Sequence, residues 1–272
     1  MIYKKNKLII DGFDVGFLGR KYKTPIYCYS LKKIKDNIQN LKNHFKKINP
    51  LICYAVKANM NLGILKEIRN NDLGADVVSA GELMKALRAG IKPQKIVFSG
   101  VGKTSPEIEY AISKNILLIN AESKSEILEI EKIAKTKKKV VNIGIRLNPN
   151  TDAQTLSQIS TGKKENKFGV DEKIFLQLVN YLKKSKYLNL KCLSVHIGSQ
   201  ILSHKPYQNM LKIVDKIIKR SAHKFEYVDL GGGMGIDYSH NNSRLNLKKY
   251  SHDIEKFLKT NDCKIIFEPG RS

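Results

Sequence analysis

From residue 51 onward, short apolar runs alternate with longer segments in which apolar residues recur at helical spacing. The short runs are rich in β-branched residues and are typical of buried strands, whereas the longer segments are typical of amphipathic helices. We predict strands at 51–56, 75–79, 95–99, 117–120, 141–147, 190–197, 227–231 and 264–268. We predict helices at about 62–71, 80–90, 105–115, 123–138, 171–185, 206–222 and 247–260. Buried strands that are joined by helices indicate a parallel sheet.

Two architectures are built from such alternation, a closed barrel and an open doubly wound sheet. The number of strand and helix units fits a (β/α)8 TIM-type barrel, which typically needs ~250 residues. The dinucleotide-binding form of the doubly wound sheet needs GxGxxG after a strand, but Ile236 stands where the last glycine should be. We therefore predict an α/β chain with a barrel at 31–272, and keep the doubly wound sheet as the alternative.

Residues 1–30 lie outside this alternation. The segments KLIID (7–11) and PIYCYS (25–30) alternate like edge strands, and a proline suits the start of such a strand. We predict that 1–30 is a short N-terminal β segment, part of a separate β structure that is mostly missing from the chain.

The net charge of +24 raises the possibility of nucleic-acid binding. The chain has 42 lysines but only seven arginines, and the lysines are spread over the polar faces of nearly every predicted helix. Recognition of phosphates and bases favours arginine, with aromatic residues interleaved. We interpret the charge as solvated surface and expect no nucleic-acid partner.

Other features of the composition indicate a cytoplasmic protein without a membrane partner. No apolar run reaches the ~18 residues of a membrane span, and the N-terminus lacks the apolar core of a signal peptide. The four cysteines lie far apart and have no metal-ligand spacing. We expect buried free thiols in a reducing compartment, and no metal site.

In a barrel, functional residues collect after the C-terminal ends of the strands. Lys57 follows the first apolar run, where a charged side chain is avoided unless something compensates it. A lysine there can lose its proton and form a Schiff base with an aldehyde. The glycines at 231–233 offer backbone amides to a phosphate, although a tight turn needs the same residues.

Two further strand ends carry polar residues. His196 and Ser199 supply a flat ring and a hydroxyl after the sixth strand, although a single core histidine is usually structural. Glu268 and Arg271 supply a carboxylate and a cation after the eighth. Taken together, these groups suit an aldehyde cofactor with a phosphate and a basic ring nitrogen, which is pyridoxal 5′-phosphate.

Seven short sequence motifs, in order along the chain, together resemble the motifs of one enzyme family. They are YAVKAN (54–59), GADVVSAGEL (74–83), IVFSGVGKT (96–104), STGKKENKFGV (160–170), HIGSQ (196–200), DLGGGMGIDY (229–238) and EPGRS (268–272). The sequence resembles the alanine racemase-like family of pyridoxal-phosphate enzymes, and within it the diaminopimelate decarboxylases. The KENKFG string is similar to these rather than to the ornithine or arginine decarboxylases.

The resemblance implies a role for each matching residue. Lys57 corresponds to the Schiff-base lysine and His196 to the histidine that stacks on the cofactor ring; these two are the expected catalytic residues. Glu268 corresponds to the partner of the pyridine nitrogen. Arg271 corresponds to a residue that contacts both the phosphate and the substrate carboxylate. The remaining expected cofactor contacts are Gly231, Gly232, Gly233, Pro269 and Gly270 at the phosphate, and Asp76, Arg146 and Ser199 elsewhere.

The resemblance also implies a reaction, the decarboxylation of meso-2,6-diaminopimelate to L-lysine and CO2, which is the last step of lysine biosynthesis. Two alternatives are a barrel that binds the cofactor without turnover, and a decarboxylase of the ornithine or arginine type. Family members continue past EPGRS into a β domain that carries a catalytic cysteine, and none of the four cysteines here matches it. We expect this domain to be absent through truncation, gene decay or splitting into two chains. The expected partners are an amino-acid substrate and either a second copy of the chain or a second chain that supplies the domain.

Overall fold

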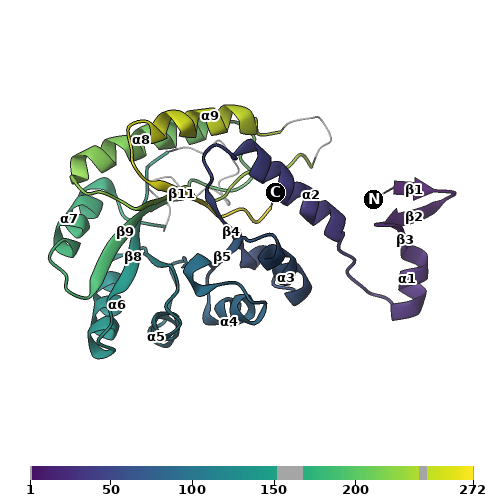
Figure 1. Ribbon diagram of the computed structural model, residues 1–272, viewed down its shortest axis with the longest axis horizontal. Helices are drawn as coiled ribbons and strands as arrows, with labels where there is room; N and C mark the ends of the chain where they lie inside the picture. The colour runs from purple at the N-terminus through teal and green to yellow at the C-terminus, as the bar shows by residue number, and fades with distance from the viewer. Residues whose placement is uncertain (1, 152–167, 239–243, 272) are drawn as a thin grey trace. The chain divides into compact units, whose positions relative to one another are not determined.

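The computed structural model describes residues 2–151, 168–238 and 244–271, and the chain divides into two compact units, Met1–Asn43 and His44–Ser272. In the larger unit, parallel strands close into a barrel in the order β10-β11-β4-β5-β6-β7-β8-β9 (Figure 1). The strands are β4 Leu51–Ala55, β5 Gly74–Val77, β6 Ile96–Phe98, β7 Leu118–Ala121, β8 Val141–Leu147, β9 Leu188–Val195, β10 Tyr227–Asp229 and β11 Lys264–Phe267. The predicted barrel is confirmed. The doubly wound alternative is wrong, because β11 pairs with β4 and closes the sheet.

Helices surround the barrel where the sequence predicts them (Figure 1). They are α3 Leu62–Asn70, α4 Ala80–Arg88, α5 Ser105–Ser113, α6 Lys124–Thr136, α7 Glu172–Leu182, α8 Lys205–Ser221 and α9 Leu247–Leu258. Polar residues cap several N-termini; Ser79 accepts a hydrogen bond from the Glu82 amide, and Ser123 from that of Glu126. No helix among the described residues is long and apolar enough to cross a membrane.

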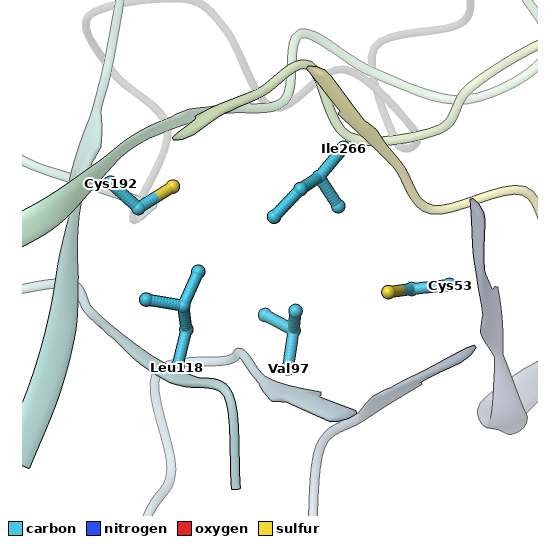
Figure 2. Packing of buried hydrophobic residues seen from close by; sticks show 5 residues of the cluster. All are labelled: Cys53, Val97, Leu118, Cys192 and Ile266. Atoms are coloured by element: carbon cyan, nitrogen blue, oxygen red, sulfur yellow. The ribbon is translucent and has the colours of Figure 1, made fainter. Parts of the chain in front are cut away.

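The barrel interior below the mouth is filled by small and branched apolar side chains. Figure 2 shows that these side chains point toward one another from five different strands, and all are fully buried. They are Cys53, Val97, Leu118, Cys192 and Ile266. Burial raises the pKa of both thiols well above its usual value. This layer fills the barrel interior, so a ligand cannot pass through it.

The smaller unit contains an antiparallel sheet of β1 Ile2–Lys4, β2 Lys7–Ile10 and β3 Phe13–Asp14, followed by α1 Val15–Tyr22 and most of α2 Leu31–His44. Strand β2 confirms the predicted strand at 7–11. The second predicted strand, 25–30, is wrong, because this segment pairs with no described strand. Alternation alone does not make a strand, since its backbone groups need a partner. The domain boundary at residue 30 stays a prediction.

Candidate active site

A cavity of about 850 Å³ lies at the C-terminal mouth of the barrel. Its wall is formed by residues at the ends of β4, β8 and β9 and by residues that follow β4, β5, β6, β8, β9, β10 and β11. Eight of the residues selected from the sequence line it: Lys57, Arg146, His196, Ser199, Gly233, Glu268, Gly270 and Arg271. The other four, Asp76, Gly231, Gly232 and Pro269, lie in adjacent strands or turns. The fold therefore brings together residues that are more than two hundred positions apart.

Lys57 lies in a single 3-10 turn, Val56–Ala58, directly after β4. Its Nζ atom is 3.6 Å from Oδ2 of Asp76, which lies on the neighbouring strand β5. The negative charge of Asp76 raises the pKa of Lys57 and outweighs the opposing effect of burial. We expected desolvation to ease deprotonation of this lysine. Desolvation does lower its pKa, but the charge of Asp76, whose position the sequence pattern does not show, outweighs that effect.

A second acidic group lies deeper in the mouth. Asp229, at the end of β10, is fully buried and accepts hydrogen bonds from Asn120 Nδ2 at 2.9 Å and Ser194 Oγ at 3.3 Å. Burial raises its pKa to about 6. Glu268 accepts a hydrogen bond from Ser99 Oγ at 3.2 Å. Burial, together with the charge of Asp229, raises the pKa of Glu268 well above its usual value.

Asp229, Asn120 and Ser194 were not predicted from the sequence to have a role in the site. Each lies in an apolar strand, where a polar or acidic side chain is unexpected unless it has partners. That signal was the same one that singled out Lys57, and it could have identified this group. The mouth therefore holds the carboxyl groups of Asp76, Asp229 and Glu268 in addition to the amine of Lys57.

His196 presents an imidazole ring to the cavity and is anchored through one nitrogen. Its Nδ1 atom accepts a hydrogen bond from the Gly232 amide at 3.1 Å. Burial, with smaller contributions from the charges of Arg146 and Lys57, lowers the pKa of His196 to about 3. The ring is therefore neutral near pH 7 and offers a flat uncharged face.

The glycine turn after β10 is too crowded for side chains. A Cβ atom on Gly232 would lie 2.2 Å from the Glu268 carbonyl oxygen, and one on Gly233 would lie 2.2 Å from that of Gly198. Gly233 also has φ of +85°, which favours glycine. The hydroxyl of Tyr207, on α8, donates to the Gly232 carbonyl at 3.0 Å and fixes the turn from below. The backbone of this turn can therefore approach a ligand closely.

The turn after β11 lies next to the glycine turn, because β10 and β11 are adjacent strands. The carbonyl oxygen of Pro269 accepts a hydrogen bond from the Ala55 amide at 2.9 Å, which joins this turn to the end of β4. Arg271 donates to the hydroxyl of Tyr238 at 2.7 Å and to that of Ser199 at 3.4 Å. These contacts hold an exposed guanidinium at the rim, where it can meet an anion.

Arg146, on β8, completes the set of cations and forms an ion pair with Glu122 at 2.9 Å. The motif KENKFG, which favoured the diaminopimelate decarboxylases over the ornithine and arginine decarboxylases, lies mostly outside the described residues. Only its Phe168 and Gly169 are described.

The family model of the pyridoxal-dependent decarboxylases, which covers their pyridoxal binding domain, matches residues 31–272. Among curated relatives, the diaminopimelate decarboxylase of Helicobacter pylori (strain J99) is 47% identical over 264 residues, and that of Campylobacter jejuni is 42% identical over 261 residues. These matches cover 96% and 95% of this chain. The chain spans 65% of the length of each relative.

Solved structures give the same result. The crystal structure of diaminopimelate decarboxylase from Helicobacter pylori complexed with L-lysine has a TM-score of 0.90 and 44% identity, and covers 94% of this chain. The alignment spans 66% of that structure. The arginine decarboxylase of Paramecium bursaria Chlorella virus has a TM-score of 0.79 at 22% identity, which shows the fold alone. Because the family model matches the whole barrel that holds the cavity, the chain belongs to the pyridoxal-dependent decarboxylases and carries their pyridoxal binding domain.

Proposed function

We propose that this chain is the pyridoxal-phosphate-binding barrel of an enzyme that decarboxylates meso-2,6-diaminopimelate to L-lysine and CO2. The observation that carries the proposal is the convergence of Lys57, His196, Glu268 and Arg271 on one cavity. Curated relatives at 42% and 47% identity bear the name diaminopimelate decarboxylase, and a similar structure was solved with L-lysine bound. The arginine decarboxylase likeness concerns the fold only, so the substrate follows the more similar relatives.

The residues present fit the cofactor. The crowded glycine turn leaves a cradle without side chains for a phosphate. Both carboxylate oxygens of Asp76 are buried and accept no hydrogen bond from a described residue, so they can receive one from a polar ligand. When bound, pyridoxal phosphate supplies an electron sink for the charge left by the departing carbon dioxide.

Lys57 provides the amine for the covalent link to the cofactor aldehyde. Its Nζ must lose a proton before it can attack, and Asp76 is the nearest group whose charge controls that proton. His196 stays neutral because of its low pKa, and its ring can pack against a flat aromatic ligand without adding charge.

Glu268 is placed to exchange a proton with a basic ring nitrogen. Its raised pKa means that it carries a proton when no basic partner is near. Glu268 would share that proton with a basic ring nitrogen placed beside it. Arg271 and Ser199, which lie at the rim, are placed to bind the anionic phosphate or substrate carboxylate.

We also propose that part of the complete active site comes from elsewhere. The matched segment is 65% of each relative, so those proteins contain further sequence that this chain does not match. The resemblance places the proton-donating cysteine and substrate-binding acids in such a region. That region would belong to a longer form of this protein or to a partner chain, and the substrate would be a small amino acid.

The cofactor link is tested by adding pyridoxal phosphate to the purified chain, reducing with borohydride and mapping the added mass by mass spectrometry. We expect the label on Lys57, with loss of labelling in Lys57→Ala and no loss in Lys66→Ala, which removes an exposed lysine of α3. Equal labelling of Lys57→Ala would contradict the assignment.

The reaction is tested by measuring CO2 release from meso-diaminopimelate, ornithine and arginine. The assay is run with the chain alone and with the remaining region of a relative added as a separate polypeptide. Release from diaminopimelate alone supports the proposal. Labelling of Lys57 without CO2 release under either condition would favour a cofactor-binding barrel without turnover, and release from ornithine or arginine would replace the substrate.

A further inference from the structure

Glu122 is a buried acid that none of the site assignments uses. It follows β7 and is 5% exposed. Its carboxylate accepts hydrogen bonds from three donors: the Gly100 amide at 3.0 Å, Arg146 at 2.9 Å and the Gly169 amide at 3.1 Å. Gly100 follows β6, Arg146 belongs to β8, and Gly169 precedes α7. One carboxylate therefore joins three segments of the barrel mouth.

The backbone of both glycines is shaped for this contact. Gly100 has φ of +101° and Gly169 has φ of +74°, conformations that favour glycine. A Cβ atom on Gly169 would lie 2.8 Å from the carbonyl oxygen of Arg146, so no side chain fits there. Both amides point to the same acid, which explains why glycine occupies both positions.

Glu122 is itself held in place from its own side. The Glu122 amide donates to Glu126 Oε2 at 2.8 Å, and Glu126 Oε1 forms an ion pair with Lys103 at 2.7 Å. The ammonium of Lys103 is fully buried and also donates to the carbonyl oxygens of Gly100 and Asn120. The acid therefore sits on a fixed support, and it can set the position of a flexible partner.

The side chain that Glu122 positions is that of Arg146. Its guanidinium lies between Glu122 and the ring of Phe168, whose centroid is 4.8 Å away, and both Arg146 and Phe168 line the cavity. An arginine that has one ion pair and one ring contact has lost most of its rotamer freedom before a ligand arrives.

We propose that Glu122 is a positioning residue, which ties the Gly100 and Gly169 amides to one point and directs Arg146 into the cavity that binds the cofactor. The part that concerns the cofactor rests on the proposed function. The anchoring of the two amides does not, so the two can be tested separately.

The first test needs no cofactor. Hydrogen exchange of the chain, read by mass spectrometry, should show protected amides at Gly100 and Gly169 in the wild type. In Glu122→Gln, one carboxylate oxygen becomes an NH2 group that cannot accept a hydrogen bond, so the glycine amide that faces it should exchange about tenfold faster. Glu107→Gln is the matched control, because Glu107 also joins two loops, through the Ala80 and Thr104 amides, but does not touch Arg146. It should leave Gly100 and Gly169 protected.

The second test measures pyridoxal phosphate affinity in a double-mutant cycle. Glu122→Gln and Arg146→Met should each weaken binding about tenfold, and the double variant should be no weaker than Arg146→Met alone. If Glu122 had a purely structural role, Glu122→Gln would lower the melting temperature. The effects of the two substitutions on affinity would then multiply in the double variant.

The outcomes separate cleanly. Unprotected Gly100 and Gly169 amides in the wild type, or unchanged exchange in Glu122→Gln, overturn the proposal, and the wild-type measurement decides even if the variant does not fold. Normal affinity in Glu122→Gln, or effects that multiply, overturns the link to Arg146. If the wild type binds no pyridoxal phosphate, the proposed function fails, and the exchange data still decide whether Glu122 anchors the mouth.

Discussion

The ammonium of Lys57 lies 3.6 Å from Asp76, and the two partners differ sharply in exposure: the lysine side chain is 60% exposed, the acid 1%. Burial of the acid raises its own pKa, while its charge raises that of Lys57. The pair therefore holds protons at the point where the proposed chemistry needs an unprotonated amine. A ligand that donates hydrogen bonds to Asp76 would favour the charged form of the acid and so lower the pKa of Asp76.

Replacing Asp76 by Asn should lower the pKa of Lys57, because the charge of Asp76 is the main cause of its elevation. More of the amine is then unprotonated at any given pH below its pKa. The rate at which Lys57 captures pyridoxal phosphate, trapped with borohydride, should rise with pH along a curve displaced to lower pH. Asp72→Asn removes an exposed acid that pairs with Lys95 and should leave the curve in place. An unshifted curve in Asp76→Asn would refute the electrostatic coupling.

Replacing Asp229 by Asn should flatten the dependence of stability on pH. The folded-state pKa of Asp229 is about 6, against an ordinary value of 3.8, so the folded protein binds this proton more tightly. Its stabilising contribution is complete below the ordinary value and is lost as pH rises through the folded-state pKa. The free energy of unfolding in urea should therefore fall less between about pH 4 and about pH 7 in the variant.

The fall should not vanish in Asp229→Asn, because burial raises the pKa of Asp76 and Glu268 in the same direction. Asp262→Asn is the control. A hydrogen bond from Lys224 lowers the pKa of that exposed acid, so any effect should be weak and opposite in sign. A slope equal to that of the wild type in Asp229→Asn would contradict the prediction.

Replacing Gly233 by Ala should destabilise the chain by about 1–3 kcal/mol, because the residue has a positive φ and its Cβ would overlap a backbone oxygen. Gly102 lines the same cavity, but a Cβ there would meet nothing within 4 Å. Gly102→Ala should change the free energy of unfolding by about 0.5 kcal/mol or less. Equal costs for the two substitutions would show that the turn is not confined as described.

The cysteines should differ in reactivity toward an alkylating reagent. Cys53 and Cys192 are fully buried and have raised pKa values, so both should label only after unfolding. Cys28 is half-buried and should label first in the native chain. Burial raises the pKa of Cys263 to about 11, which should make it slower than Cys28 at neutral pH. Labelling of Cys53 or Cys192 in the native chain at the rate of Cys28 would show that the barrel interior opens.

Local pattern was sufficient for most of the fold. Alternating strands and helices show themselves within windows of a few residues, so the barrel and the strand ends that carry Lys57, His196 and Glu268 could be predicted from the sequence. The segment 25–30 shows the limit of this approach. Its residues alternate as in a strand, but whether a strand forms depends on a partner elsewhere in the chain.

The sequence by itself determined which chemical groups are present and at which strand ends they stand. Only the tertiary structure decided how these groups act on one another. It set Asp76 beside Lys57 and so reversed the expected direction of the lysine pKa shift. It also brought Asn120 into hydrogen-bond contact with Asp229, 109 residues away. Around Glu122 it gathered three hydrogen-bond donors. The physical reason is that the sign and size of an electrostatic interaction depend on distance and burial, which are properties of the folded chain and not of neighbours in sequence.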